Sequence, residues 1–153
     1  MDRRVVYRSP TPYDEARIHA AAIYCSDGRV GEQLDEFLHQ GLGLPRYDRL
    51  ACPGGPSSLS GRFLAFWEGQ GVEQQLRFLH RVHALQQVIL IAHEGCAYYQ
   101  VRLGFPAADV EREQRTDLER AAKAVIGIDG ALQVRAFFAL RQESRIAFEA
   151  VPV

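Results

Sequence analysis

Two short, unbroken apolar runs constrain the fold of this chain more than any other feature of its sequence. They cover residues 18–24 and residues 88–92. Neither run alternates apolar with polar residues, as the strands of a half-exposed sheet do. Continuous apolar runs of this length are typical of strands that are covered on both faces, and such strands belong to parallel sheets. The two runs therefore favour an α/β fold.

The rest of the sequence supplies helices and further strands around these two runs. Apolar residues at helical spacing predict helices over residues 30–41, 61–85 and 109–126, the second interrupted at Gly69-Gln70-Gly71. Further strands are predicted over residues 46–52, 131–140 and 145–151. The short segment 141–144 suits a hairpin and leaves no room for a crossover helix, so the last strand should run antiparallel.

This order predicts a three-layer α/β fold around an open, mostly parallel sheet. We expect four parallel strands, a C-terminal antiparallel edge strand and helices on both faces. With 153 residues, the chain fits a single domain over residues 1–153, and residues 1–16, which contain Pro10 and Pro12, should form an irregular arm. Ligands of such sheets bind beyond the carboxyl ends of the strands, where the strand order reverses.

Charge and composition exclude several functional classes. The 18 basic residues are balanced by 19 acidic ones, which gives no indication of nucleic acid or an anionic membrane as a partner. No run is long enough to span a membrane, and the N-terminus has no signal-peptide pattern. We therefore expect a cytoplasmic protein whose three cysteines are reduced.

Three potential metal ligands follow the two apolar runs. Cys25 comes directly after the first run, His93 directly after the second, and Cys96 lies three positions further on. If the two strands are neighbours, these side chains converge at one edge of the sheet. A set of two thiolates and one imidazole suits Zn²⁺, and three protein ligands leave a fourth position open, as in catalytic zinc sites.

Asp27 and Arg29 supply polar groups next to the predicted metal site. Two residues apart beyond the first strand, they could both face the crevice, with guanidinium and carboxylate joined by two parallel hydrogen bonds. Asp27 would then stay ionised and accept a hydrogen bond from a zinc-bound water. The structural alternative is a helix-capping aspartate beside a surface arginine.

The strings Cys-x-Asp-x-Arg at residues 25–29 and His-x-x-Cys at residues 93–96 resemble the signature of the beta class of carbonic anhydrases. By motif, the resemblance covers residues 18–96. It implies a zinc enzyme that interconverts carbon dioxide and bicarbonate through a zinc-bound hydroxide, with Asp27 and Arg29 as the orienting pair. It also implies assembly into homodimers, and an inactive state in which the aspartate takes the fourth position on the zinc.

The sequence departs from this family at two points. Cys52-Pro53-Gly54-Gly55 stands where Arg-Asn-Ala-Gly is common, and Ala97 follows Cys96 in place of glycine. The altered loop either approaches a bound group or is an ordinary tight turn. Two further hypotheses stay open: hydrolysis of an analogue such as carbonyl sulfide or carbon disulfide, and a non-catalytic zinc-binding protein with Asp27 permanently on the metal.

The remaining candidate residues are assigned structural roles. His80 and His83 have a spacing that could chelate a metal, but no third ligand accompanies them, so we expect a solvated or interface face. We expect His19 in the core or at the entrance of its strand, and Cys52 as a small apolar side chain. Glu94 should face solvent, and at least one of Tyr98 and Tyr99 should pack in the core.

Overall fold

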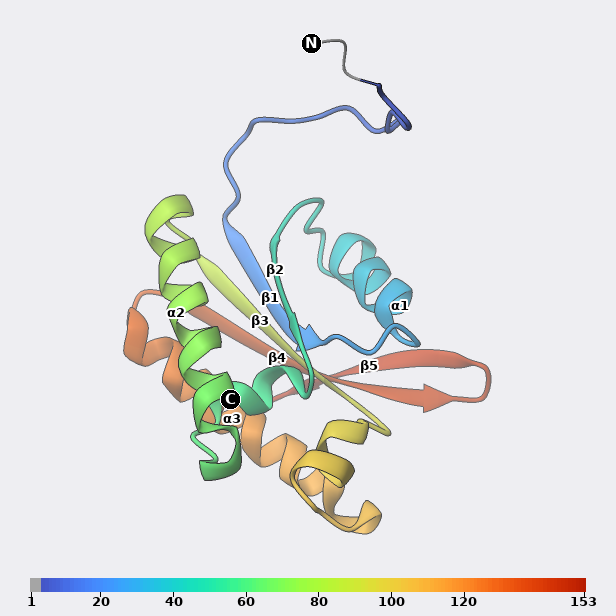
Figure 1. Cartoon of the computed structure of the whole chain (residues 1–153), viewed down its shortest axis with the longest axis vertical. Coiled ribbons are helices and arrows are strands. Elements are labelled where there is room, and N and C mark those ends of the chain that lie inside the picture. Colours follow the sequence, from blue (N-terminus) through green and yellow to red (C-terminus); the bar gives the residue numbers. More distant parts are fainter. Residues whose placement is uncertain (1–3) are drawn as a thin grey trace.

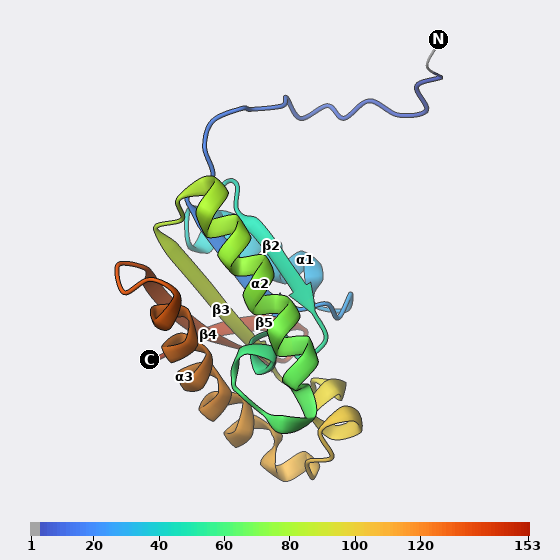
Figure 2. The ribbon, with the colours of Figure 1, turned by 60° about the vertical axis from the view of Figure 1, so that its left-hand side comes forward.

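A computed structural model describes residues 4–153 of the chain. The first three residues of the expected arm lie outside the described residues. Residues 4–19 contain no helix or strand, and their N-terminal part extends away from the rest of the molecule (Figures 1 and 2). The carbonyl oxygens of Asp14 and Ala16, by contrast, accept hydrogen bonds from Arg46 at 3.0 and 2.8 Å. No helix within residues 4–153 combines the length and the apolar composition that crossing a membrane requires.

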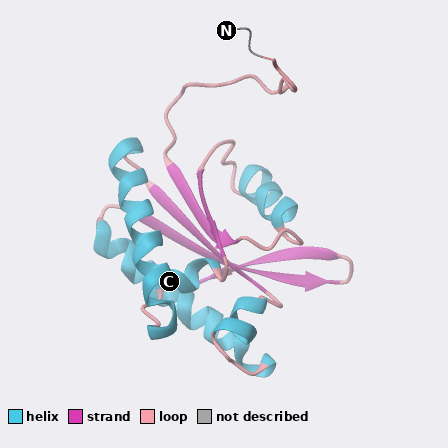
Figure 3. Ribbon diagram, in the orientation of Figure 1, coloured by secondary structure: helices cyan, strands magenta, loops and turns pink. Residues whose placement is uncertain are grey.

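The described residues form one five-stranded sheet with the predicted topology (Figure 3). The strand order is β2-β1-β3-β4-β5, in which β5 alone runs antiparallel to its neighbour. This confirms four parallel strands with an antiparallel strand at the edge. The strands are β1 (Ala20–Cys25), β2 (Asp48–Cys52), β3 (Gln87–His93), β4 (Gln133–Gln142) and β5 (Arg145–Val151).

The two apolar runs lie side by side at the centre of the sheet. Strands β1 and β3 pair in parallel, from Ala20 opposite Gln87 to Tyr24 opposite Ile91. All six residues of β1 are buried, as expected of a strand covered on both faces. Because the register is parallel, both strands end at the same edge of the sheet.

Helices cover both faces of the sheet, which confirms the three layers (Figure 2). Helix α1 (Gly31–Glu36) continues into the π-helix η1 (Phe37–Gly41) and packs on one face through Leu34 and Leu38. Helices α2 (Phe66–His83) and α3 (Val110–Ile128) cover the other face with apolar side chains that include Leu76 and Leu118. Each face is thus sealed by an apolar cluster of its own.

The predicted interruption at Gly69-Gln70-Gly71 is wrong, because α2 runs through these residues without a break. A Cβ atom at Gly69 would lie 2.2 Å from the carbonyl oxygen of Ser58 in the 3₁₀ helix η2 (Gly55–Leu59). The glycine therefore allows η2 to approach the helix closely. This contact accounts for a residue that weakens a helix locally.

Candidate metal centre

The structure brings Cys25, His93 and Cys96 together at the carboxyl edge of the sheet. Cys25 is the last residue of β1, His93 is the last residue of β3, and all three side chains are buried. Their potential ligand atoms all lie within 4.8 Å of one another. The two Sγ atoms are 3.8 Å apart. The described residues contain no other such group of histidine, cysteine and carboxylate side chains.

A tight turn after β3 returns Cys96 to the site. Gly95 adopts φ +72°, a conformation that glycine tolerates without strain. Cys96 then lies just before the π-helix η4 (Tyr98–Arg102). Its carbonyl oxygen accepts a hydrogen bond from the Tyr99 amide at 3.3 Å. The thiol packs in a small apolar cluster that also includes Tyr99.

The loop after β2 supports Cys25 from the other side. Gly54 and Gly55 have φ +76° and φ +49°. A Cβ atom at Gly55 would lie 2.8 Å from the Cys25 nitrogen and 2.7 Å from the carbonyl carbon of Tyr24. The close approach for which this loop needs glycine is therefore an approach to the chain's own backbone at the end of β1.

The protonation of the three side chains is set by their mutual contacts. A hydrogen bond from the Cys96 thiol lowers the pKa of Cys25 to about 4, against the opposing effect of burial. The same hydrogen bond, together with burial, raises the pKa of Cys96. Without a metal, the contact between the two sulfurs thus favours deprotonation of Cys25 and opposes that of Cys96.

The imidazole of His93 has one satisfied nitrogen and one that faces the thiols. Its Nδ1 lies 2.9 Å from the carbonyl oxygen of Glu94, which can only accept a hydrogen bond. This contact assigns the proton to Nδ1 and leaves Nε2 as a lone-pair donor. Nε2 is buried and has no hydrogen-bond partner within residues 4–153. A buried nitrogen without a partner, next to two sulfurs, fits a metal ligand.

The donor set fits zinc. Thiolate sulfur and neutral imidazole nitrogen are the ligands that Zn²⁺ prefers, and a carbonyl on the second imidazole nitrogen is the usual support of a metal-bound histidine. Three such ligands leave room for a fourth group, which is the arrangement of catalytic sites rather than closed structural ones.

Asp27 and Arg29 form the expected pair directly after β1. The Arg29 Nε atom donates to both carboxylate oxygens at 3.0 and 3.1 Å, and Nη2 donates to Oδ2 at 2.6 Å. The Arg29 amide also donates to Oδ1 at 3.0 Å. These hydrogen bonds lower the pKa of Asp27 to about 2. The Asp27 side chain is 17% exposed, so the carboxylate remains accessible at the edge of the site.

An almost apolar cavity of about 380 Å³ opens beside the metal centre. It borders Cys25 and Asp27, and its wall includes Pro53, Ala97 and Val101. A smaller cavity of about 150 Å³ borders Asp27 together with His93. Both cavities reach the predicted site residues, and the apolar one suits a substrate without charge.

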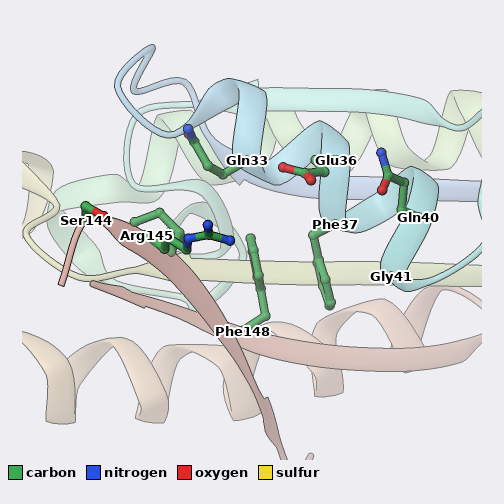
Figure 4. Close-up of a pocket in the computed structure, with 9 residues that line it drawn as sticks. Gln33, Glu36, Phe37, Gln40, Gly41, Ser144, Arg145 and Phe148 are labelled. Carbon is green, nitrogen blue, oxygen red and sulfur yellow. The ribbon is translucent and has the colours of Figure 1, made fainter. Parts of the chain in front are cut away.

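A different cavity, of about 440 Å³, lies between α1, η1 and β5 (Figure 4). The rings of Phe37 and Phe148 stack there with their centroids 4.0 Å apart. Glu36 and Arg145 also line it. None of the predicted site residues borders this cavity, so it does not belong to the candidate metal centre.

The histidines of α2 do not converge on a metal. His80 Nε2 pairs with Asp129 at 2.9 Å, whereas His83 Nδ1 pairs with Asp48 at 2.7 Å. The two side chains thus contact different elements. Both histidines are partly exposed, which agrees with the prediction of a solvated or interface face. His19 is exposed at the entrance of β1, also as expected.

The other assigned residues follow the predictions closely. Tyr99 is fully buried, and Tyr98 lines the apolar cavity beside Cys25. Cys52 is partly buried against the main core, with its Sγ 3.7 Å from the carbonyl oxygen of Gly55. It is therefore a packing residue outside the group of three ligands.

Two residues near His93 have contacts that sequence reasoning missed. Glu94 is exposed, as expected, and its carboxylate also contacts β4: Oε2 accepts a hydrogen bond from the Arg141 amide at 2.7 Å. Gln114 of α3 is buried and donates from Nε2 to the His93 carbonyl oxygen at 2.8 Å. In the sequence, the burial of Gln114 was indicated by its position between Val110 and Leu118 on the inward face of its helix.

Comparison with known proteins gives a family and a fold. The family described as "Putative carbonic anhydrase" matches residues 15–148. An uncharacterized protein of Rickettsia conorii is 28% identical over 105 residues, which cover 68% of this chain and 53% of the relative. An uncharacterized protein of Rickettsia bellii is 26% identical over 108 residues, covering 68% and 65%. The matched region thus spans between half and two thirds of these relatives.

Among solved structures, the beta-carbonic anhydrase isoform I of Trichomonas vaginalis has a similar fold. The TM-score is 0.57 with 12% sequence identity, and the match covers 92% of this chain and 87% of that one. At this identity, the likeness establishes the architecture of the sheet and its helices.

Proposed function

Because this chain belongs to the family described as "Putative carbonic anhydrase", we propose that it catalyses the reversible hydration of carbon dioxide to bicarbonate with zinc as its metal. The observation that carries the proposal is the convergence of Cys25, His93 and Cys96 beside an ionised Asp27. The fold, shared with a beta-carbonic anhydrase, supports it.

In this proposal, the two sulfurs and the His93 Nε2 atom hold the zinc ion. Bound zinc would act as a Lewis acid that lowers the pKa of a water molecule to near neutrality. The protein excludes bulk water from the ligands, because Cys25, His93 and Cys96 are each less than 10% exposed. Burial also strengthens the electrostatic interactions of the site.

Asp27 is proposed to orient the attacking water. Arg29 keeps the pKa of Asp27 at about 2, so this carboxylate accepts hydrogen bonds but does not take up a proton near neutral pH. A water molecule that donates a hydrogen bond to Asp27 has its lone pairs directed away from the carboxylate. Asp27 is thus a hydrogen-bond acceptor that selects an orientation, and it is not the general base.

The apolar cavity beside Cys25 is proposed to bind carbon dioxide. Its walls from Pro53, Ala97 and Val101 offer few polar groups, which suits an uncharged and nonpolar substrate better than bicarbonate. The contrast between an apolar wall and an ionised Asp27 would favour release of the charged product.

We further propose that the protein acts as a cytoplasmic homodimer. All three cysteines are free, which agrees with a reducing compartment. Phe63, Trp67 and Val101 are 91%, 81% and 85% exposed, which is unusual for large apolar side chains. A hydrogen bond of 2.6 Å from Arg102 to the Leu64 carbonyl oxygen joins their two segments near the mouth of the apolar cavity. A partner subunit covering these side chains would close that mouth.

Stopped-flow measurement of carbon dioxide hydration tests the main proposal. We expect zinc-loaded protein to accelerate the reaction above the buffer rate between pH 7 and 9, and Cys96→Ser to abolish this acceleration. No acceleration at any pH in that range would remove the proposal. Light scattering of the wild type and of Trp67→Glu tests the dimer, which the charged side chain should dissociate.

A second candidate is the hydrolysis of carbonyl sulfide or carbon disulfide at the same site. It is favoured by the volume of about 380 Å³ and the apolar lining of the cavity, to which Pro53 of the altered loop contributes. Sulfide release from these substrates separates the two reactions. A cobalt-substituted sample that is four-coordinate and has no exchangeable water would instead favour a non-catalytic zinc-binding protein, with Asp27 as the fourth ligand.

A further inference from the structure

The peptide unit that follows His93 is held by hydrogen bonds from two neighbouring elements. Gln114 of α3 donates to the His93 carbonyl oxygen at 2.8 Å. On the opposite side, the Glu94 amide donates to the Ala139 carbonyl oxygen of β4 at 2.8 Å. The Glu94 carboxylate also accepts from the Arg141 amide of β4 at 2.7 Å. The orientation of this peptide is thus determined by α3 and β4 together.

The main chain of Glu94, which joins this peptide unit to the next one, in turn orients the imidazole of His93. The Glu94 carbonyl oxygen accepts the hydrogen bond from His93 Nδ1, so its position determines the direction in which Nε2 points. A displaced carbonyl would rotate the ring away from Cys25 and Cys96. Groups that fix the main chain at residues 93 and 94 therefore act on the metal centre without touching it.

Stability of the fold alone does not explain why a glutamine occupies the buried position 114. Its side chain is 1% exposed, and its Oε1 atom has no hydrogen-bond partner within the described residues. An unpaired, buried amide oxygen destabilises the folded state, whereas an apolar side chain of similar size would avoid this cost. The contact that gives the amide a role at this position is its donation to the His93 carbonyl oxygen.

We propose that Gln114 and Glu94 are positioning residues that hold the Nε2 atom of His93 toward Cys25 and Cys96. Gln114 acts from α3 on the His93 carbonyl, and Glu94 acts through its contact with β4. The inference rests on the proposed function only in that His93 is a metal ligand.

Gln114→Met tests the first half of the proposal. Methionine has a similar volume but cannot donate to the carbonyl. We expect the metal-free variant to melt at the same temperature as the wild type or above it, while its zinc affinity falls about tenfold or more, as for other outer partners of metal ligands. Zinc affinity is measured by competition with a chromophoric chelator. Unchanged affinity, or a loss of affinity matched by a lower melting temperature, would overturn the role of Gln114.

Glu94 is tested by two variants and a matched control. Glu94→Gln keeps an oxygen that can accept from the Arg141 amide, whereas Glu94→Ala removes it. We expect the alanine variant to bind zinc about tenfold more weakly and the glutamine variant to retain most of the affinity. Glu149→Ala is the control, because it removes a similarly exposed carboxylate whose partner is a side chain, Arg115 at 2.9 Å, and not the main chain of β4. Equal affinities for all three variants would refute the role of Glu94.

A measurement without metal separates this inference from the proposed function. In the metal-free wild type, the proton on His93 Nδ1 should exchange slowly with solvent in NMR spectra. Glu94→Ala and Gln114→Met should accelerate the exchange, and Glu149→Ala should not. If the wild type binds no zinc, the proposed function fails, but this exchange still decides whether the two residues position the ring.

Discussion

The histidines at the two ends of the sheet differ in what their ring nitrogens contact. Near the end of α2, His80 and His83 pair with the carboxylates of Asp129 and Asp48. At the carboxyl edge, His93 contacts a carbonyl through Nδ1, and its buried Nε2 faces two thiols. His80 also leaves one ring nitrogen unpaired within residues 4–153, but no thiol joins it. The convergence of several potential ligand atoms on one point, and not spacing in the sequence, therefore distinguishes the candidate metal site from these ion pairs.

Replacing one histidine from each region gives the largest expected effect. His93→Ala removes one of three ligands, so we expect zinc binding to weaken by more than the roughly 10–100-fold typical of outer partners. His83→Ala should keep full zinc stoichiometry and lose no more than about 1 kcal/mol of unfolding free energy, as for exposed ion pairs. Elemental analysis and chemical denaturation measure the two quantities. A similar loss of zinc in both variants would erase the distinction between the regions.

Asp27→Asn sharpens the comparison within the metal site. Asparagine keeps the size of the side chain but loses its charge and donates where the carboxylate accepts. Since the wild-type carboxylate is ionised, we expect kcat/KM for carbon dioxide hydration to fall about a hundredfold at unchanged zinc content. Full activity in the zinc-loaded variant would show that Asp27 does not orient the reacting water.

Substitution of one glycine in each region compares how tightly the backbone is packed at the two ends of the sheet. Gly55→Ala would place a Cβ atom 2.7 Å from the Tyr24 carbonyl carbon at φ +49°, and it should cost about 2 kcal/mol and weaken zinc binding by displacing Cys25. Gly130→Ala, next to Asp129, meets open space and should change stability by less than about 0.5 kcal/mol. Thermal unfolding and zinc titration of both variants measure this difference. Equal stability of the two would mean that the end of β1 is not tightly packed.

The smallest expected effect concerns acid stability. Arg29 lowers the folded-state pKa of Asp27 to about 2, below the value of roughly 3.9 for an unfolded chain. The stabilisation is therefore present above about pH 4 and is lost as the pH falls through 2. Arg29→Gln should remove this stabilisation, and the change should be small because Arg29 is largely exposed and solvent screens the pair. Denaturation of the metal-free proteins between pH 2 and 5 should show the two curves converging at the acid end.

Most of the fold and the cluster of potential ligands could be predicted from the sequence, because both depend on strong local patterns. The apolar runs identified two central strands, and a parallel sheet necessarily places Cys25 and His93 at one edge. The continuity of α2 could not be predicted, since Gly69 is accounted for by its contact with Ser58, a residue of another element.

The supporting residues of the site were harder to find. In the sequence, Glu94 and Gln114 are polar residues that could equally well face solvent. What distinguishes them is the main chain that each contacts, in β4 and β3, and such contacts exist only once the sheet and α3 are assembled. The position of Gln114 one helical turn from Val110 and from Leu118, on the inward face of α3, was the available indication.

The separation of Cys25 and Cys96 by 71 positions has a consequence for how the protein matures. If the two cysteines bind one zinc ion as proposed, that ion would close a large loop, and it could do so only after the central strands are aligned. Capture of the ion would then come late during folding, and a newly made chain that had acquired its metal would already have completed its sheet.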